Sequence, residues 1–161
     1  MRFALLAGLL TAGTVLAFAQ ADSASRSILH GAAVEYMFPE QVNVAAGKPT
    51  EIALHFRIAE GLHINSHVPR DEYLIPTSFS IPDGLGVRLQ DANYPDGKDL
   101  TLPSDPSTRL SVYTGEFVIH AHVIAEAGDH LVEAKLHYQA CNDTQCLPPK
   151  TIPVAIDVVS K

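Results

Sequence analysis

The sequence predicts an all-β sandwich of about seven to eight short strands. Apolar and polar residues alternate with a period of two in several segments, as in half-buried strands. Turns rich in Gly, Pro and Asp separate these segments. Beyond the first residues no segment keeps a helical period of 3.6. The chain has no Trp and 2 Cys, so the antibody-type pattern of a Trp and two distant cysteines is missing.

The N-terminus reads as a secretory signal peptide. Arg2 supplies a positive charge, and an apolar run of about 16 residues follows. Ala17-Phe-Ala19 or Ala19-Gln-Ala21 then offers a small-x-small cleavage site. The run is shorter than the roughly 20 residues of a spanning helix, so an uncleaved anchor is the minor alternative. We therefore expect a cleaved signal peptide at 1–21, a flexible lead-in at 22–33 and one domain at 34–161.

The charge of the chain limits its partners. The formal net charge is −7, and cleavage would remove Arg2 and no acid, which makes it −8. An acidic domain without a basic cluster is a poor ligand for nucleic acid or for an anionic membrane. We expect neither partner once the signal peptide is removed. Export makes a disulfide permissible.

The clearest strand is expected at 51–58, where four apolar side chains alternate with more polar ones. The 110–125 segment is expected to form one long strand, or two strands broken near Gly115, and 104–108 a loop. Pro153 cannot donate to a ladder, so the last strand should have an open side there. Further strands are expected at 34–38, 77–81, 87–90, 100–102, 131–140 and 152–158.

Both cysteines lie in one short segment between two expected strands. An extended run from Cys141 to Cys146 would separate their Cα atoms by roughly 16 Å. A disulfide needs about 4.4 to 6.8 Å, so the chain must reverse if the sulfurs are to meet. Asn142 and Asp143 favour such a turn. A ring of about six residues stabilises by only ~2 kcal/mol, which is modest for a domain large enough to bury its own core.

The residues around the cysteines resemble a known family. Tyr138-Gln-Ala-Cys141, a short polar turn and Cys146-Leu-Pro-Pro together resemble the N-terminal periplasmic domain of the thiol:disulfide interchange protein DsbD. The similarity covers most of the chain, from Val34 to Val159. Weaker similarity is found in three further segments: Gly61-Leu-His-Ile-Asn65, Leu74-Ile-Pro-Thr77 and Leu110-Ser-Val-Tyr-Thr-Gly-Glu116.

This resemblance implies an immunoglobulin-like antiparallel β-sandwich with Cys141 and Cys146 as its redox pair. Such a pair takes electrons from a thioredoxin-like or membrane-embedded donor, here expected on another chain, and reduces disulfides in periplasmic proteins. Cys146 is our choice for the sulfur that forms the mixed disulfide. If the chain acts as an enzyme, it is a thiol:disulfide oxidoreductase.

Four residues are expected to support the pair. The family carries tyrosines where this chain has His63 and Asn65, and its cap loop, which bears an aromatic, corresponds to the region near Tyr94. Tyr138 lies on the apolar row of its strand and should support the turn. A strongly attacking thiol needs a cation or a helix N-terminus nearby, and the turn instead contains Asp143. We therefore expect an unactivated pair that works as an electron carrier.

Two other functions remain open from the sequence. One is a non-catalytic exported binding module, in which a structural disulfide shapes a recognition loop. The other is a metal-handling exported protein, because the chain has 8 His and pairs such as His63 with His67 and His120 with His122 are closely spaced. These pairs match ordinary strand positions, so we expect no metal ion and no other cofactor.

Overall fold

The structure, a computed structural model, describes residues 32–37 and 41–161. The predicted signal peptide at 1–21 and most of the predicted lead-in lie outside these residues. In the part described, no helix is long and apolar enough to span a bilayer. Twelve strands are formed there: β1 (Val34–Met37), β2 (Gln41–Val44), β3 (Thr50–Ile58), β4 (His63–Asn65), β5 (Ser78–Ser80), β6 (Val87–Asn93), β7 (Lys98–Leu102), β8 (Asp105–Tyr113), β9 (Glu116–Ala125), β10 (Gly128–Tyr138), β11 (Ala140–Cys141) and β12 (Lys150–Ser160).

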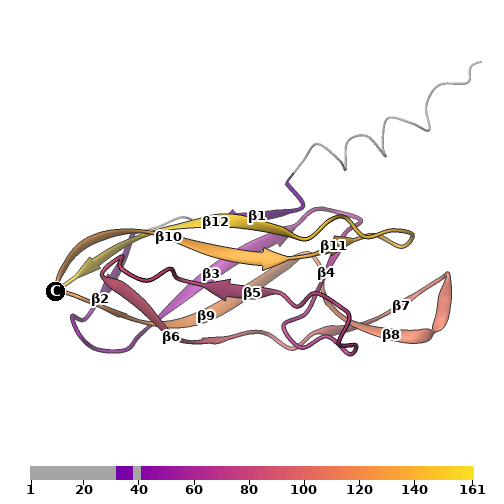
Figure 1. Cartoon of the computed structure of the whole chain (residues 1–161), viewed down its shortest axis with the longest axis horizontal. Helices are drawn as coiled ribbons and strands as arrows, with labels where there is room; N and C mark the ends of the chain where they lie inside the picture. Colours follow the sequence, from indigo (N-terminus) through magenta and orange to yellow (C-terminus); the bar gives the residue numbers. More distant parts are fainter. Residues whose placement is uncertain (1–31, 38–40) are drawn as a thin grey trace, which may run out of the picture. The chain divides into compact units, whose positions relative to one another are not determined.

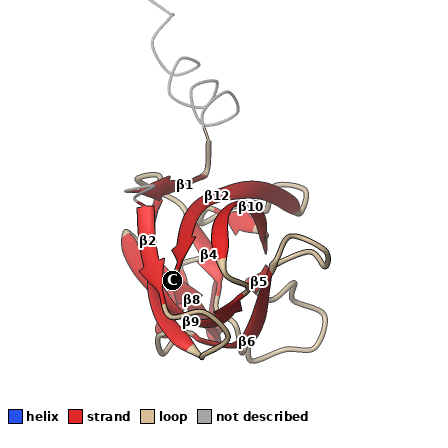
Figure 2. Ribbon diagram, turned by 90° about the vertical axis from the view of Figure 1, so that its left-hand side faces the viewer, coloured by secondary structure: helices blue, strands red, loops and turns tan. Residues whose placement is uncertain are grey.

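The strands form three four-stranded sheets. Their orders are β1-β3-β9-β6, β2-β12-β10-β5 and β11-β4-β8-β7 (Figure 1). Neighbouring strands are antiparallel except β2, which runs parallel to β12. In the end-on view of Figure 2, β10 and β12 lie across the core from β9 and β6. The predicted all-β sandwich is confirmed. Its described part has more strands than expected because β2, β4 and β11 are too short to show a period of two.

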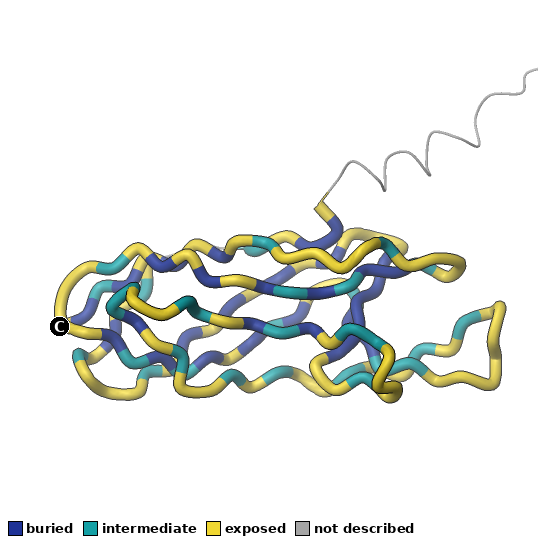
Figure 3. The backbone as a smooth tube through the Cα atoms, viewed as in Figure 1, coloured by how far each residue is buried: buried dark blue, intermediate teal, exposed yellow. Residues whose placement is uncertain are grey.

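The core is built from the alternating side chains that the sequence predicts to face inward. Leu54 and Phe56 of β3 are at most 1% exposed, and the Phe56 ring stacks on Phe117 of β9 with 5.2 Å between centroids. The second sheet contributes Leu136 of β10 and Ile156 of β12, which are equally buried. Buried positions occur along the strands of both sheets (Figure 3). Each such side chain stabilises the fold by about 1.5–3 kcal/mol through burial. This core is extensive without the disulfide.

Two predictions about strand limits have different outcomes. The 110–125 segment does contain a break, because β8 ends at Tyr113 and β9 begins at Glu116. The predicted loop at 104–108 is wrong, since β8 already begins at Asp105. Leu102 pairs with Asp105 and Thr101 with Arg109, so the three residues after Asp105 bulge from the ladder. β8 thus makes a single pair at Asp105 and resumes its ladder at Arg109, and the loop-like composition of the residues between gave no sign of a strand.

The open side expected at Pro153 is also present. β2 pairs with Asp157–Ser160 of β12 and stops before Pro153. On its other side, Pro153 lies opposite Lys135 of β10. Among the described residues, no strand therefore pairs with β12 at Pro153 on the side that β2 occupies further along the strand.

Candidate functional site

The two cysteines face each other across a tight hairpin at one end of the domain, next to β4 and away from the C-terminus (Figure 1). Leu147 N donates to Ala140 O at 2.8 Å, and Asn142 N donates to Gln145 O at 2.9 Å. The residue pair between these two hydrogen bonds is a non-hydrogen-bonded pair of the antiparallel ladder. In such pairs the two Cα atoms approach to about 4.5 Å. That pair is made by the cysteines, which are 3.9 Å apart at Cα and joined by a disulfide. The predicted chain reversal is confirmed.

Asn142 holds the turn in place. Its side-chain Oδ1 accepts hydrogen bonds from Thr144 N at 2.9 Å, from Gln145 N at 2.8 Å and from Thr144 Oγ1 at 3.0 Å. One amide oxygen thus satisfies two backbone donors that the turn would otherwise leave to water. The turn is therefore stabilised by its own residues as well as by the disulfide.

The two cysteines differ in exposure. Cys141 belongs to β11, pairs with β4 and is 4% exposed. Cys146 lies beyond the turn and is exposed. Exchange begins when a thiolate attacks one disulfide sulfur, and access decides which sulfur is attacked. The geometry therefore leaves Cys146 accessible to solvent and shields Cys141.

A small pocket surrounds the disulfide. Its volume is about 260 Å³. Besides the cysteines and the turn, it is lined by residues of β4, of the segment before β5 and of the β7–β8 hairpin: His63, Asn65, Leu74, Leu102, Ser104 and Leu110. The leucines were not predicted as site residues. They belong to segments with little periodicity, so only the fold reveals that they meet at the cysteines.

Asn65 links β4 to the segment that carries Leu74. Its Nδ2 donates to Ile75 O at 3.0 Å, and its backbone carbonyl accepts from Thr77 Oγ1 at 2.6 Å. Asn65 is 1% exposed, and Thr77 is fully buried. These bonds hold the Leu74 segment against the cysteine pocket. A supporting role for Asn65 stays a prediction, and the contacts are consistent with it.

Tyr138 and Tyr94 have different positions relative to the pair. Tyr138 ends β10, three residues before Cys141, and is 1% exposed, and burial raises the pKa of its phenol. Tyr94 lies outside the set of residues that line the cysteine pocket. It borders a separate hollow of about 680 Å³, where its ring stacks on His67 with 3.7 Å between centroids. Its hydroxyl accepts a hydrogen bond from Phe79 N at 2.7 Å. The structure thus brings His63 and Asn65 to the cysteines, but not Tyr94.

His63 is a buried titratable group beside the cysteines. It is 4% exposed and lies opposite Cys141 in the β4–β11 pairing. Burial lowers the pKa of its imidazole, and the carboxylate of Asp143 opposes this shift in part. A lowered pKa favours the neutral ring, which can accept a proton.

A comparison with models of protein families places the chain in one of them. The model described as "Thiol:disulfide interchange protein DsbD, N-terminal" matches residues 33–157. The chain belongs to this family. Among solved structures, the crystal structure of the Neisseria meningitidis DsbD N-terminal domain in the reduced form is similar at 18% identity. That match covers 70% of this chain and 80% of that one, with a TM-score of 0.47. No curated protein matches.

Family membership and the paired cysteines agree with the resemblance seen in the sequence. The fold is the immunoglobulin-like β-sandwich of DsbD N-terminal domains, which are of a periplasmic type. The close pair of Cys141 and Cys146 fits a thiol–disulfide exchange domain. A DsbD N-terminal domain implies thiol–disulfide interchange partners in general.

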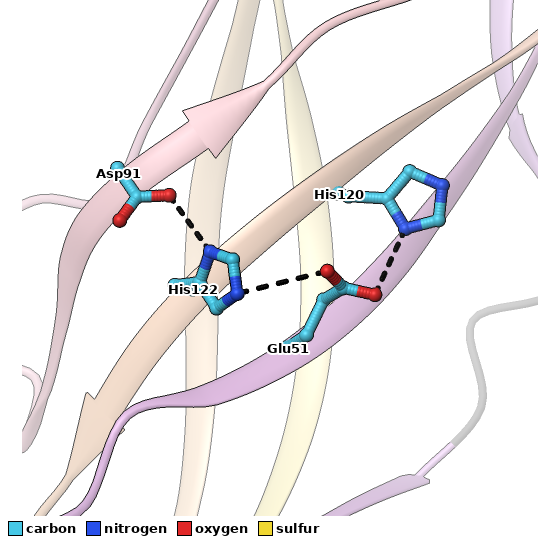
Figure 4. Close-up of polar contacts among 4 residues, drawn as sticks. All are labelled: Glu51, Asp91, His120 and His122. Carbon is cyan, nitrogen blue, oxygen red and sulfur yellow. Dashed lines mark hydrogen bonds and ion pairs between the residues drawn. The ribbon is translucent and has the colours of Figure 1, made fainter.

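His120 and His122, one of the two histidine pairs considered for metal binding, contact carboxylates in this DsbD-type domain. His122 Nδ1 contacts Asp91 at 2.7 Å, and its Nε2 lies 3.6 Å from Glu51 (Figure 4). His120 Nδ1 contacts the other oxygen of Glu51 at 3.1 Å. These contacts form a chain of pairs across three strands. Within residues 32–37 and 41–161, no group of three or more His, Cys, Asp or Glu side chains is arranged to hold a metal ion.

Proposed function

We propose that the protein relays electrons in the periplasm through Cys141 and Cys146. The donor is a thioredoxin-like or membrane-embedded protein on another chain, and the acceptors are exported proteins with disulfides. A signal peptide at 1–21 would direct export, and the 34–161 domain would carry the activity. The observation that carries the proposal is the unequal exposure of the two cysteines within a family of interchange domains.

The relay follows from ordinary disulfide exchange. A donor thiolate attacks Cys146 Sγ, the bond between the cysteines breaks, and Cys141 leaves as a thiolate. A second donor thiol then attacks the donor sulfur of this mixed disulfide. The donor's own disulfide forms, Cys146 is released, and both cysteines of the pair are reduced, having gained two electrons. Cys146 then attacks an acceptor disulfide, and Cys141 displaces the acceptor as a thiolate while the bond between the cysteines forms again. The acceptor gains the two electrons that the donor lost.

The surroundings of Cys146 favour a carrier over a strong attacking thiol. A depressed thiol pKa comes from a helix N-terminus or a nearby cation. The described residues form strands and turns, and the turn itself contributes the acidic Asp143. The pair therefore depends on an activated thiolate of its donor to begin exchange.

Trapping experiments test this proposal. In Cys141→Ala the exposed Cys146 keeps its thiol and has no neighbouring cysteine to resolve it. It should therefore form a stable, reducible one-to-one mixed disulfide with a thioredoxin-like domain that keeps only its attacking cysteine and is supplied as the mixed disulfide with thionitrobenzoate. The matched variant Cys146→Ala leaves the buried Cys141 and should trap far less. If neither variant traps the domain, and a reduced thioredoxin-like donor cannot open the native bond, the proposal fails and a structural disulfide in a binding module becomes the better account.

A further inference from the structure

His63 of β4 lies directly opposite the buried cysteine. The β4–β11 pairing places His63 across from Cys141 and Ile64 across from Ala140. Directly opposed residues of antiparallel strands have Cβ atoms about 4.5–5.5 Å apart on one side of the sheet. Both side chains line the cysteine pocket, and both residues are 4% exposed. The imidazole and the thiol of reduced Cys141 therefore share one pocket, in which both residues lie on the buried side.

Cys141 must lose its thiol proton before it can react, and His63 lies where it can accept that proton. In the proposed relay it must attack Cys146 Sγ to release a bound acceptor, and only its thiolate can do so. An ordinary Cys thiol has a pKa of about 8.5, and burial in apolar surroundings raises it. Leu74, Leu102 and Leu110 line the pocket and supply such surroundings. Without a proton acceptor, Cys141 would stay protonated and unreactive near neutral pH.

We propose that His63 accepts the proton of the Cys141 thiol during the resolving step, and that Asp143 stabilises the imidazolium that forms. The proton moves from Cys141 Sγ to the ring, the thiolate attacks Cys146 Sγ, and the acceptor leaves as a thiolate. The ring then loses its proton to solvent or to the departing thiolate. In the opposite direction, the imidazolium returns a proton to Cys141 as the donor displaces it. This role rests on the proposed exchange function and adds a proton carrier to it.

The charges around His63 suit both states of the ring. Burial lowers the pKa of the imidazole and keeps the resting ring neutral, while Asp143 favours the charged ring. On the neighbouring strand β8, burial raises the pKa of Tyr113, which therefore adds no charge. His63 also borders a second hollow whose charged lining residues are Arg57, Glu60, Glu116 and Asp143. Arg57 pairs with Glu116 at 3.0 Å, so the balance of these groups is acidic and favours an imidazolium once it forms.

The aromatic disulfide DTNB separates the two sulfur reactions without any biological partner. When the reduced protein reacts with DTNB, the exposed Cys146 releases one coloured thiolate, and resolution by Cys141 releases a second. General bases typically contribute 10²–10⁴-fold. In His63→Gln we expect the second release to slow at least tenfold at pH 7 while the first stays within twofold. Above pH 9 the difference should shrink, because hydroxide can ionise Cys141 directly.

The matched control is His67→Gln, a histidine that lies outside the residues lining the cysteine pocket and should leave both releases unchanged. A second release that is equally fast in His63→Gln and wild type from pH 5.5 to 9 would overturn the proposal. Equal slowing of both releases would also overturn it, since that marks a general loss of structure.

Asp143→Asn gives an independent test that keeps His63. The rate of the second thiolate release should rise with pH as the His63 ring loses its proton. Loss of the Asp143 carboxylate should move the midpoint of that rise to lower pH, because the imidazolium loses its stabilising charge. In a His63→Gln background the same substitution should move the midpoint much less. Equal shifts in both backgrounds would show that Asp143 acts on the thiol directly and would overturn the role given to His63. DTNB takes the place of the partner in these experiments. They therefore test the role of His63 even if the protein fails to exchange electrons with a thioredoxin-like donor, and the two failures can be told apart.

Discussion

The β10–β12 ladder and the cysteine hairpin are continuous in sequence but are built in different ways. β10 and β12 each have 11 residues and pair along their whole length. β11 has 2 residues and β4 has 3, and the hairpin there depends on single contacts such as those of Asn142 Oδ1. The ladder gains its stability from many buried side chains, whereas the hairpin gains a defined geometry from few. Stability and sulfur chemistry should therefore respond to different substitutions.

The largest effect on stability is expected in the ladder. Leu136 is fully buried, so Leu136→Ala should lower the free energy of unfolding by about 2–5 kcal/mol. The reaction of Cys146 with DTNB in the folded, reduced protein should remain unchanged. Urea unfolding and DTNB kinetics measure the two quantities. A small loss of stability, or a large change in cysteine reactivity, would show that the two regions are not separable in this way.

Reduction of the disulfide should have a smaller effect. Opening a ring of about six residues removes ~2 kcal/mol in the loop-entropy model, and the core of the sandwich stays intact. We expect the reduced protein to keep its β-sheet circular dichroism spectrum at 25 °C and to unfold at a lower urea concentration. The double variant Cys141→Ala/Cys146→Ala should behave like the reduced protein. Loss of the folded spectrum on reduction would mean that the bond holds the fold together.

The smallest effect is a pH dependence that belongs to the hairpin end. Burial, opposed in part by Asp143, holds the folded-state pKa of His63 below its unfolded value of about 6.5. Below that pH the unfolded chain takes up the proton more readily, so this stabilisation is present above pH 6.5 and is lost as pH falls towards the folded pKa. The free energy of unfolding of the oxidised protein can be measured with urea at several pH values between 5 and 7.5. It should change less with pH in His63→Gln than in His67→Gln. Equal slopes would contradict a buried, neutral His63.

The sequence predicted the ladder better than the hairpin end, for a physical reason. Val132, Ala134 and Leu136 alternate with charged residues over enough positions to reveal both strand and buried face. A strand such as His63–Asn65 has all three residues buried, and its length hides any period. Its pairing with β11 and β8 is a property of the folded chain. Family resemblance could therefore suggest that His63 lies near Cys141, but residue patterns alone could not place the two opposite each other.

The cysteine turn itself could be predicted because chain geometry left few choices. Five residues of separation and a sulfur–sulfur bond together demand a reversal, and Asn142 supplies the turn chemistry. The surroundings of the turn come from distant segments. Leu74 and Leu110 reach the pocket from a loop and from β8, whereas Tyr94 lies beside His67 in the other hollow. Such contacts depend on how the sheets pack, which short-range patterns do not encode.

The reduction potential of the Cys141–Cys146 pair tests the central claim most directly. It can be measured by equilibrating the full chain in dithiothreitol or glutathione buffers and counting trapped thiols by mass. An exchange pair must be reducible by a thioredoxin-like donor, so we expect a value above about −300 mV, within the range of interchange proteins. A value well below about −300 mV would identify a structural bond and contradict the account.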